Sequence, residues 1–145
     1  MPEVRELEAG VSHLAAPALL ELRPHLRTAD ELTDRVEALR AGGYRVAASF
    51  EPGEEAAAAA AGFRVAENLH MGRHLYVDDL VTRAAMRGRG HADALFAWLE
   101  TEARAQGCAV LHLDSGVQAE REDAHRFYFR HGMRIASYHF SRVLN

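Results

Sequence analysis

The sequence predicts a single mixed α/β domain, and three observations support this prediction. The chain has 145 residues, a typical length for one compact domain. Hydrophobic residues make up 48% of the chain and charged residues 26%, so a domain of this size can fold without disulfides or a structural metal. Helical and strand-like patterns alternate along the chain without a linker, a repeat or a block of charge. We therefore expect one domain over residues 1–145.

The first half of the chain predicts two strands and two helices. A strand is expected at Val4–Glu8 and a helix at Val11–Leu26, where leucines recur at helical spacing. Thr28 begins a capping box, a serine or threonine followed three residues later by an acid, and the helix after it is expected to end at Gly42. Tyr44–Phe50 is rich in aromatic and β-branched residues, which favours a strand.

The middle of the chain contains six consecutive alanines, Ala56–Ala61. Alanine has the highest helix propensity, so propensity alone predicts a helix. The segment is short, however, and lies between two strand-like stretches. We interpret Ala57–Glu67 as a strand whose small side chains allow helices to pack closely.

The second half predicts a hairpin connection, three strands and two helices. Asn68–Arg73 has the composition of a hairpin connection. The expected elements are a strand at His74–Thr82, a helix at Gly88–Gln106, a strand at Val110–Leu113, a helix at Ala119–His131 and a strand at Ile135–Leu144. A helix between two strands of one sheet forms a right-handed crossover, which we expect around Gly88–Gln106.

The turn between the expected strand at His74–Thr82 and the following helix has the composition of an anion site. It contains the glycines at positions 88 and 90 and the arginines at positions 87 and 89. N–H groups at a helix N-terminus have no intrahelical partner, and glycines let a phosphate approach them without a Cβ in the way. Arginine adds fork-shaped donors. The other interpretation is an ordinary turn, and the common nucleotide-binding glycine patterns are absent.

Two motifs resemble those of the GNAT superfamily of N-acyltransferases. Arg87–Ala92 reads Arg-Gly-Arg-Gly-His-Ala, which is similar to the acyl-CoA signature of that family. Ala124–Met133 resembles the family's downstream segment with consecutive phenylalanine and tyrosine. One expected helix and one expected strand separate the motifs, as in the family. The departures are Ala84, His91, Arg121 and Met133, where proline, an aliphatic residue, asparagine and phenylalanine are common.

The resemblance implies both a fold and a reaction. The fold is a mixed, mostly antiparallel sheet with splayed central strands, flanked by helices. The reaction is direct attack by a primary amine of a small molecule or peptide on the thioester of acetyl-CoA, the cosubstrate. The implied cofactor-binding residues are Leu80, Val81, Thr82, Arg87, Gly88, Arg89, Gly90, His91 and Ala92.

The acidic pair Asp78 and Asp79 is the candidate that removes the ammonium proton before attack. The pair resembles one in polyamine-acetylating members of the family, where an acid is proposed to relay the proton through water. Because side chains alternate along a strand, only one of the two is expected to face the site. Asp78 shares a face with Leu80 and Thr82, so we predict Asp78. The alternative is that both aspartates only pair with nearby arginines.

Tyr128 is the candidate general acid for the departing thiolate, as the resemblance implies for the tyrosine of the second motif. Without the motif, a tyrosine beside Phe127 would be interpreted as a core aromatic. Cys108 precedes an expected buried strand, so we interpret it as a packing residue and not as a nucleophile. The nine histidines lack acid or cysteine partners at ligand spacing, so no metal site is predicted.

Charge, cysteine content and hydropathy limit the partners. The net charge of −4 and the lack of a basic and aromatic patch oppose nucleic-acid binding. No apolar run approaches the roughly 20 residues that span a bilayer, and no secretory signal is recognisable. A single cysteine fits a reducing compartment, so we expect a cytoplasmic protein. We expect no membrane partner, and the sequence leaves a homodimer open. The alternative function is a catalytically inert GNAT-like domain that binds CoA as a sensor or assembly module.

Overall fold

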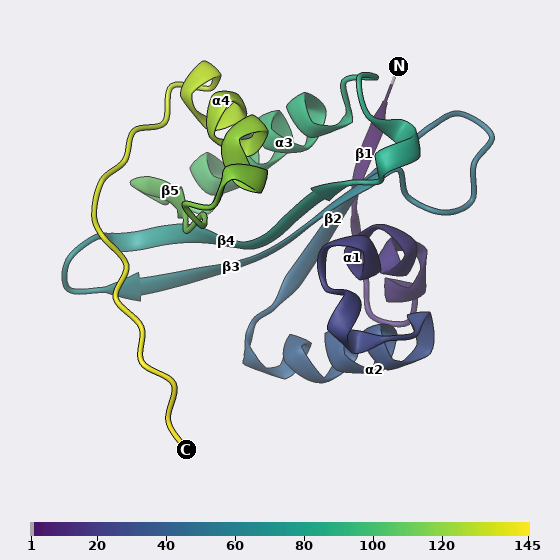
Figure 1. Cartoon of the computed structure of the whole chain (residues 1–145), viewed down its shortest axis with the longest axis horizontal. Coiled ribbons are helices and arrows are strands. Elements are labelled where there is room, and N and C mark those ends of the chain that lie inside the picture. Colours follow the sequence, from purple (N-terminus) through teal and green to yellow (C-terminus); the bar gives the residue numbers. More distant parts are fainter. Residues whose placement is uncertain (1) are drawn as a thin grey trace. The chain divides into compact units, whose positions relative to one another are not determined.

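The computed structural model describes residues 2–145 and contains a five-stranded sheet in the order β1-β2-β3-β4-β5 (Figure 1). The strands are β1 (Glu3–Leu7), β2 (Arg45–Phe50), β3 (Ala59–Asn68), β4 (Gly72–Thr82) and β5 (Val110–Leu113). The first four strands pair in antiparallel fashion with their neighbours. The predicted mixed α/β class with a mostly antiparallel sheet is confirmed.

The α-helices are α1 (Ala16–Leu22), α2 (Ala29–Leu39), α3 (His91–Ala105) and α4 (Glu122–Arg130). The chain divides into two compact units, one that ends at His112 and one formed by Leu113–Asn145. The first unit holds nearly the whole sheet with α1, α2 and α3, and the second holds α4. No helix within residues 2–145 has the length and apolar character needed to cross a membrane.

The helix expected at Val11–Leu26 is shorter in the structure at both ends. Short 3-10 turns at Ser12–Ala15 and Pro24–Leu26 flank the seven-residue α1. Proline lacks the N–H that a helix interior needs, so Pro17 is accepted only in the first turn of α1, and Pro24 follows its end. The capping box is confirmed, because the Thr28 hydroxyl accepts a hydrogen bond of 3.1 Å from the backbone N–H of Glu31.

The alanine-rich segment forms β3, which confirms the strand interpretation. The five alanines from position 57 to 61 are fully or almost fully buried. Ala60 and Ala57 belong to a core cluster with Leu19 of α1 and Leu32 of α2. The backbone can thus approach the helices closely, and pairing with β2 and β4 overrides the helix propensity of alanine.

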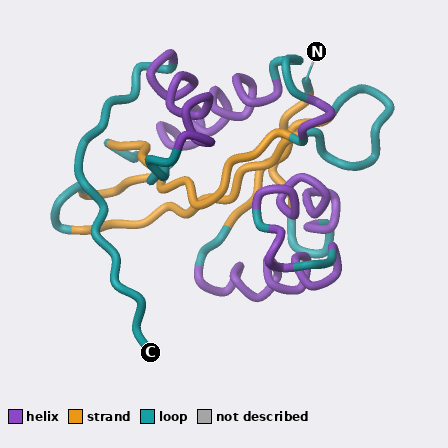
Figure 2. Tube along the Cα trace, viewed as in Figure 1, coloured by secondary structure: helices purple, strands orange, loops and turns teal. Residues whose placement is uncertain are grey.

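The sheet of the first unit is covered on both faces, as Figure 2 shows. α1 and α2 pack on one face, where Val46, Ala48 and Ala60 join the core cluster and Val81 packs against it. On the other face the Phe63 ring lies edge-on against Trp98 of α3, with a centroid separation of 5.7 Å. α3 therefore has a fixed position on the sheet.

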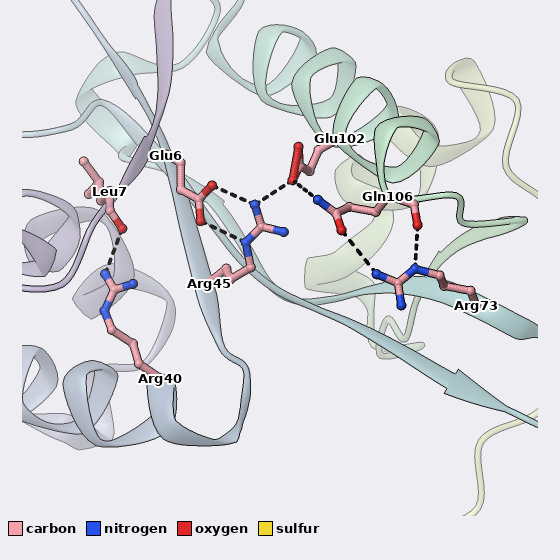
Figure 3. A network of polar contacts seen from close by, with 7 residues as sticks. All are labelled: Glu6, Leu7, Arg40, Arg45, Arg73, Glu102 and Gln106. Carbon is pink, nitrogen blue, oxygen red and sulfur yellow. Dashed lines mark hydrogen bonds and ion pairs between the residues drawn. The ribbon is translucent and has the colours of Figure 1, made fainter.

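Polar contacts anchor the C-terminal half of α3 to three strands (Figure 3). Arg45 of β2 binds Glu6 of β1 with two hydrogen bonds of 2.7 and 2.8 Å and binds Glu102 of α3 at 2.6 Å. Arg73 of β4 donates to the backbone carbonyl of Gln106, next to the helix end. A cation at a helix C-terminus is favourable because of the helix dipole.

The prediction of a strand at Ile135–Leu144 is wrong. After α4 the chain has no regular secondary structure, and Figure 2 draws this segment as loop. The side chains of Ile135, Tyr138, Phe140, Val143 and Leu144 are between 75% and 90% exposed. Alternating apolar residues satisfy only one requirement of a strand, since a ladder also needs a partner strand. The preceding helix is also shorter than expected, because Ala119–Arg121 forms a 3-10 turn before α4.

Candidate functional site

The turn between β4 and α3 has the geometry of an anion cradle. Gly88 and Gly90 have φ angles of +77° and +87°, which side-chain-bearing residues rarely adopt. Gly90 is the N-cap of α3 and no side chain caps this helix end. No capping side chain therefore accepts a hydrogen bond from the first N–H groups of this 15-residue helix. These groups lie at the positive end of the helix dipole.

Two exposed arginines flank these backbone donors. Arg87 ends the 3-10 turn that follows β4, and Arg89 lies between the two glycines. The guanidinium of Arg89 is 3.7 Å from the Glu51 carboxylate, and such a partly exposed ion pair contributes little to stability. The exposed guanidiniums of Arg87 and Arg89 thus lie beside the start of α3, and their role in binding phosphate stays a prediction.

His91, the first residue of α3, has a buried side chain. Its side chain is 0% exposed and bridges Ser49 Oγ, 2.7 Å from Nδ1, and Glu51 Oε1, 2.8 Å from Nε2. The hydrogen bond between His91 Nε2 and Glu51 lowers the pKa of the Glu51 carboxyl. Only the backbone N–H of His91 is available to the cradle, and the imidazole instead fixes the start of α3 to β2.

The end of β4 extends beyond its neighbour β5. The Ala109 N–H donates to the Arg73 carbonyl at 2.9 Å, and the ring of His112 lies against those of His74 and Tyr76. β5 has four residues and β4 eleven, so β5 runs beside only the first half of β4. Leu80–Thr82 lies past this pairing, where its backbone groups can bind an extended ligand.

A register shift in β4 changes the position of the acidic pair. Gly62 of β3 pairs with Asp79, but the next residue, Phe63, pairs with Val77, so Asp78 is the extra residue of a β-bulge. Alternation is interrupted there, and Asp79, not Asp78, continues the face of Val81, which packs against the α1 and α2 core. Because Asp78 is the residue of the bulge, alternation alone does not decide which aspartate faces the acceptor, and the choice of Asp78 stays a prediction.

Asp79 is held by two donors. The Tyr44 hydroxyl donates to Asp79 Oδ2 at 2.7 Å, and Arg23 Nε donates to Asp79 Oδ1 at 2.8 Å. Burial and the neighbouring Asp79 carboxylate raise the pKa of Tyr44, so this phenol remains a proton donor. Arg23 follows α1 directly, and its contact ties the end of that helix to the bulge.

Asp78 is paired as well. Arg64 of β3 binds both of its carboxylate oxygens, at 2.7 and 2.9 Å, and Arg23 Nη2 donates to its backbone carbonyl at 3.2 Å. Both aspartates thus pair with arginines, as the alternative interpretation of the sequence expects. The two carboxylates remain partly exposed, at 23% for Asp78 and 16% for Asp79.

The partners of the acidic pair, Tyr44, Arg23 and Arg64, are not predicted from the sequence. They are 35, 56 and 14 residues away from their aspartates along the chain. The sequence signal for this arrangement is Gly62, which follows the alanine run. A glycine inside a strand often marks a bulge or a close approach, and an added Cβ here would lie 1.7 Å from the Tyr44 hydroxyl oxygen.

Replacing Gly62 with alanine is expected to destabilise the protein by about 1–3 kcal/mol, because the buried Tyr44 must move and its bond to Asp79 breaks. Thermal unfolding measures this effect. Gly42→Ala is the control, since an added Cβ there meets no atom within 4 Å and φ is not positive. Equal melting temperatures for Gly62→Ala and the wild type would contradict the packing of Tyr44 on Gly62.

Tyr128 lies on α4 in the C-terminal unit and is half-buried. Burial raises the pKa of its hydroxyl, and the positive charge of Arg121, together with a hydrogen bond from it, opposes this rise. Arg121, the N-cap residue of α4, is one of the departures from the family pattern. The phenol is therefore protonated at neutral pH, as a general acid must be before it donates.

Cys108 and two of the histidines, His74 and His112, lie outside the glycine turn and the acidic pair. Burial raises the pKa of the Cys108 thiol, which disfavours the thiolate form that acts as a nucleophile. His112 Nε2 and His74 Nδ1 are 2.8 Å apart in a hydrogen bond. Within residues 2–145 no three histidine, cysteine or acidic side chains are grouped so that they could hold a metal ion.

Adding a Cβ at Gly90 is expected to weaken CoA binding more than removing a side chain of the turn. Gly90→Ala would add a methyl group at the N-cap of α3, where φ is +87°, whereas Arg89→Ala removes one charge-assisted contact, about 10- to 100-fold in affinity. Titration calorimetry with CoA measures both.

The control for Gly90→Ala is Gly107→Ala, at the other end of α3. Gly107 also has a positive φ, +73°, and a Cβ there meets no atom within 4 Å. The two variants carry a similar backbone strain, so only Gly90→Ala should bind CoA more weakly. Similar CoA affinity in the two variants would argue against the cradle.

Comparison with known proteins shows the family to which the chain is similar. The model of the Acetyltransferase (GNAT) family matches residues 10–133. The uncharacterized N-acetyltransferase YhdJ of Bacillus subtilis (strain 168) is 34% identical over 127 residues, which cover 87% of each chain. The aminoalkylphosphonate N-acetyltransferase of Salmonella typhimurium (strain LT2) is 36% identical over 84 residues, which cover 53% of each chain.

Solved structures share the fold. The structure of AAC(6')-Iy in complex with the bisubstrate analog CoA-S-monomethyl-acetylneamine matches with a TM-score of 0.81 and 15% identity, and covers 100% of this chain and 99% of that one. At this identity the likeness concerns the fold alone. It places the sheet and helices described above among those of known acetyltransferase folds.

Proposed function

Because the chain belongs to the GNAT family of acetyltransferases, we propose that it transfers an acetyl group from acetyl-CoA to a primary amine of a small molecule or peptide. The observation that carries the proposal is the uncapped N-terminus of α3 behind two glycines with positive φ. One relative is named for an amine substrate, an aminoalkylphosphonate, which favours a small-molecule acceptor.

In the proposed complex the cradle binds the pyrophosphate of acetyl-CoA. The donors are the backbone N–H groups from Gly88 to Ala92, with Arg87 and Arg89 as additional fork-shaped donors. The backbone of Leu80–Thr82 hydrogen-bonds the pantetheine and the acetyl carbonyl. The extension of this part of β4 past β5 supports that role.

The amine nitrogen attacks the thioester carbon directly. The N–C bond forms, the C–S bond breaks, and the electron pair of the latter leaves with the CoA sulfur. Before attack, the ammonium loses a proton through water to the acidic pair Asp78 and Asp79. The departing thiolate takes a proton from the Tyr128 hydroxyl, and the second proton of the attacking nitrogen, lost as the amide forms, returns through water to the Tyr128 oxygen. The raised pKa of the Cys108 thiol supports direct transfer over an acetylated enzyme.

The proposal is tested by the release of CoA thiol from acetyl-CoA in the presence of a panel of primary amines, with the acetylated product identified by mass spectrometry. We expect acceptor-dependent thiol release and a product that carries one acetyl group. If CoA binds but no amine of the panel is acetylated, the chain is a CoA-binding module and the proposed function is wrong.

A further inference from the structure

Two arginines from different elements meet at the acidic pair. Arg23, next to the end of α1, contacts Asp79 Oδ1 and the carbonyl of Asp78, while Arg64 of β3 grips the Asp78 carboxylate. Both guanidiniums are thus within hydrogen-bonding distance of the same residue, Asp78. The two arginines and the two aspartates form one cluster at the bulge of β4.

Each guanidinium keeps donors for a ligand. Arg23 and Arg64 both use Nε and Nη2 in these contacts, which leaves the Nη1 group and one N–H of Nη2 of each side chain unused among the described residues. The side chains are 44% and 47% exposed. They can therefore accept a ligand without breaking their bonds to the aspartates.

The charge of the cluster also limits the ligand. Two guanidinium and two carboxylate charges cancel, and Tyr44, with its raised pKa, adds no charge. A ligand with only an ammonium would find both carboxylates already paired with cations. A ligand that carries an ammonium and an oxyanion presents one charge to each half of the cluster and leaves the total unchanged.

We propose that the acceptor is a zwitterion: a primary amine that carries an oxyanion, which Arg23 and Arg64 bind while the ammonium lies against Asp78 and Asp79. This inference rests on the proposed function and names its substrate class. The planar guanidinium binds phosphonate, phosphate or carboxylate with two parallel hydrogen bonds, so these groups share the recognised chemistry. The arginines also hold the acidic pair in place for the proton transfer.

The first test compares acceptors that differ mainly in their anionic group, with the wild-type protein. 2-Aminoethylphosphonate, β-alanine and n-propylamine are the probes, and kcat/KM for acetyl transfer is measured at one pH. We expect the phosphonate or the carboxylate to exceed n-propylamine by about 10- to 100-fold, the value of one or two charge-assisted hydrogen bonds. The better of the two anionic probes identifies the oxyanion.

The second test locates the effect. Arg64→Gln is expected to reduce the ratio of kcat/KM between the better anionic probe and n-propylamine by about tenfold or more, and Arg64→Lys to restore part of it. The control is Arg104→Gln on α3, whose 76% exposed side chain pairs only with Glu100 in the described part of the chain. The control should leave the ratio unchanged.

The outcomes separate this inference from the proposed function. If the wild type acetylates n-propylamine as well as the anionic probes, or if Arg64→Gln leaves the ratio unchanged, the zwitterionic acceptor is wrong although the protein is an N-acetyltransferase. If it acetylates none of the amines in a broad panel, the proposed function is wrong instead. The wild-type comparison holds even if Arg64→Gln does not fold.

Discussion

Replacing Tyr128 with phenylalanine is expected to lower kcat by about 10²–10⁴-fold while CoA affinity and stability change little. The substitution keeps the ring and its packing on α4 and removes only the hydroxyl. Thiolate charge develops late in the transfer, so a phenol that donates to sulfur stabilises the transition state more than the bound thioester. The loss should therefore appear in kcat and less in the Michaelis constants.

The pH profile of the wild type tests the same role. A general acid is active in its protonated form, so activity should fall as the pH rises through the pKa of Tyr128. Because burial raises that pKa, the alkaline fall is expected above pH ~10, the ordinary value for tyrosine. Tyr128→Phe should lack this limb.

Tyr138→Phe is the matched control, because Tyr138 is a tyrosine of the same unit that is 86% exposed in the segment after α4. It should behave as the wild type does. Turnover of Tyr128→Phe within about twofold of the wild type would remove Tyr128 from the mechanism.

The acidic pair is expected to have the second largest effect. The double variant Asp78→Asn/Asp79→Asn should lose about 10²–10⁴-fold in kcat/KM, most strongly at acidic pH, where free amine is scarce. Because the bulge interrupts the alternation, each single variant is expected to be impaired. If instead one variant is normal, only the other carboxylate accepts the proton.

The side-chain amide introduced by Asp79→Asn would still offer an acceptor oxygen to Tyr44, so packing is preserved while the charge is lost. Asp34→Asn, on the exposed side of α2, is the control for a charge change far from the bulge. Steady-state rates over a pH series, with CoA affinity measured in parallel, separate proton transfer from cofactor binding. Wild-type rates in the double variant would exclude the acidic pair from catalysis.

The sequence predicted those features that depend on neighbouring residues. The capping box at Thr28 and the glycine turn before α3 are local, and the structure contains both. The bulge at Asp78 could not be predicted, because it depends on how β3 and β4 are aligned, and one shifted residue reverses which side chains share a face.

Two other features of the structure also depend on residues that are distant in sequence. The burial of His91 depends on Ser49 and Glu51, which are 42 and 40 residues earlier in the chain. The strand expected at Ile135–Leu144 has the right alternation but no ladder among the described residues. A periodic pattern predicts which face of an element is apolar, whereas contacts distant in sequence decide what that face meets.

In the proposed reaction the acetyl group passes directly from acetyl-CoA to the amine. Initial rates measured with acetyl-CoA and the amine both varied test this claim most directly, together with a mass spectrum of the protein after incubation with acetyl-CoA alone. Direct transfer predicts intersecting double-reciprocal lines and an unmodified chain. Parallel lines, with an acetyl group retained on the protein at Cys108 or elsewhere, would contradict it.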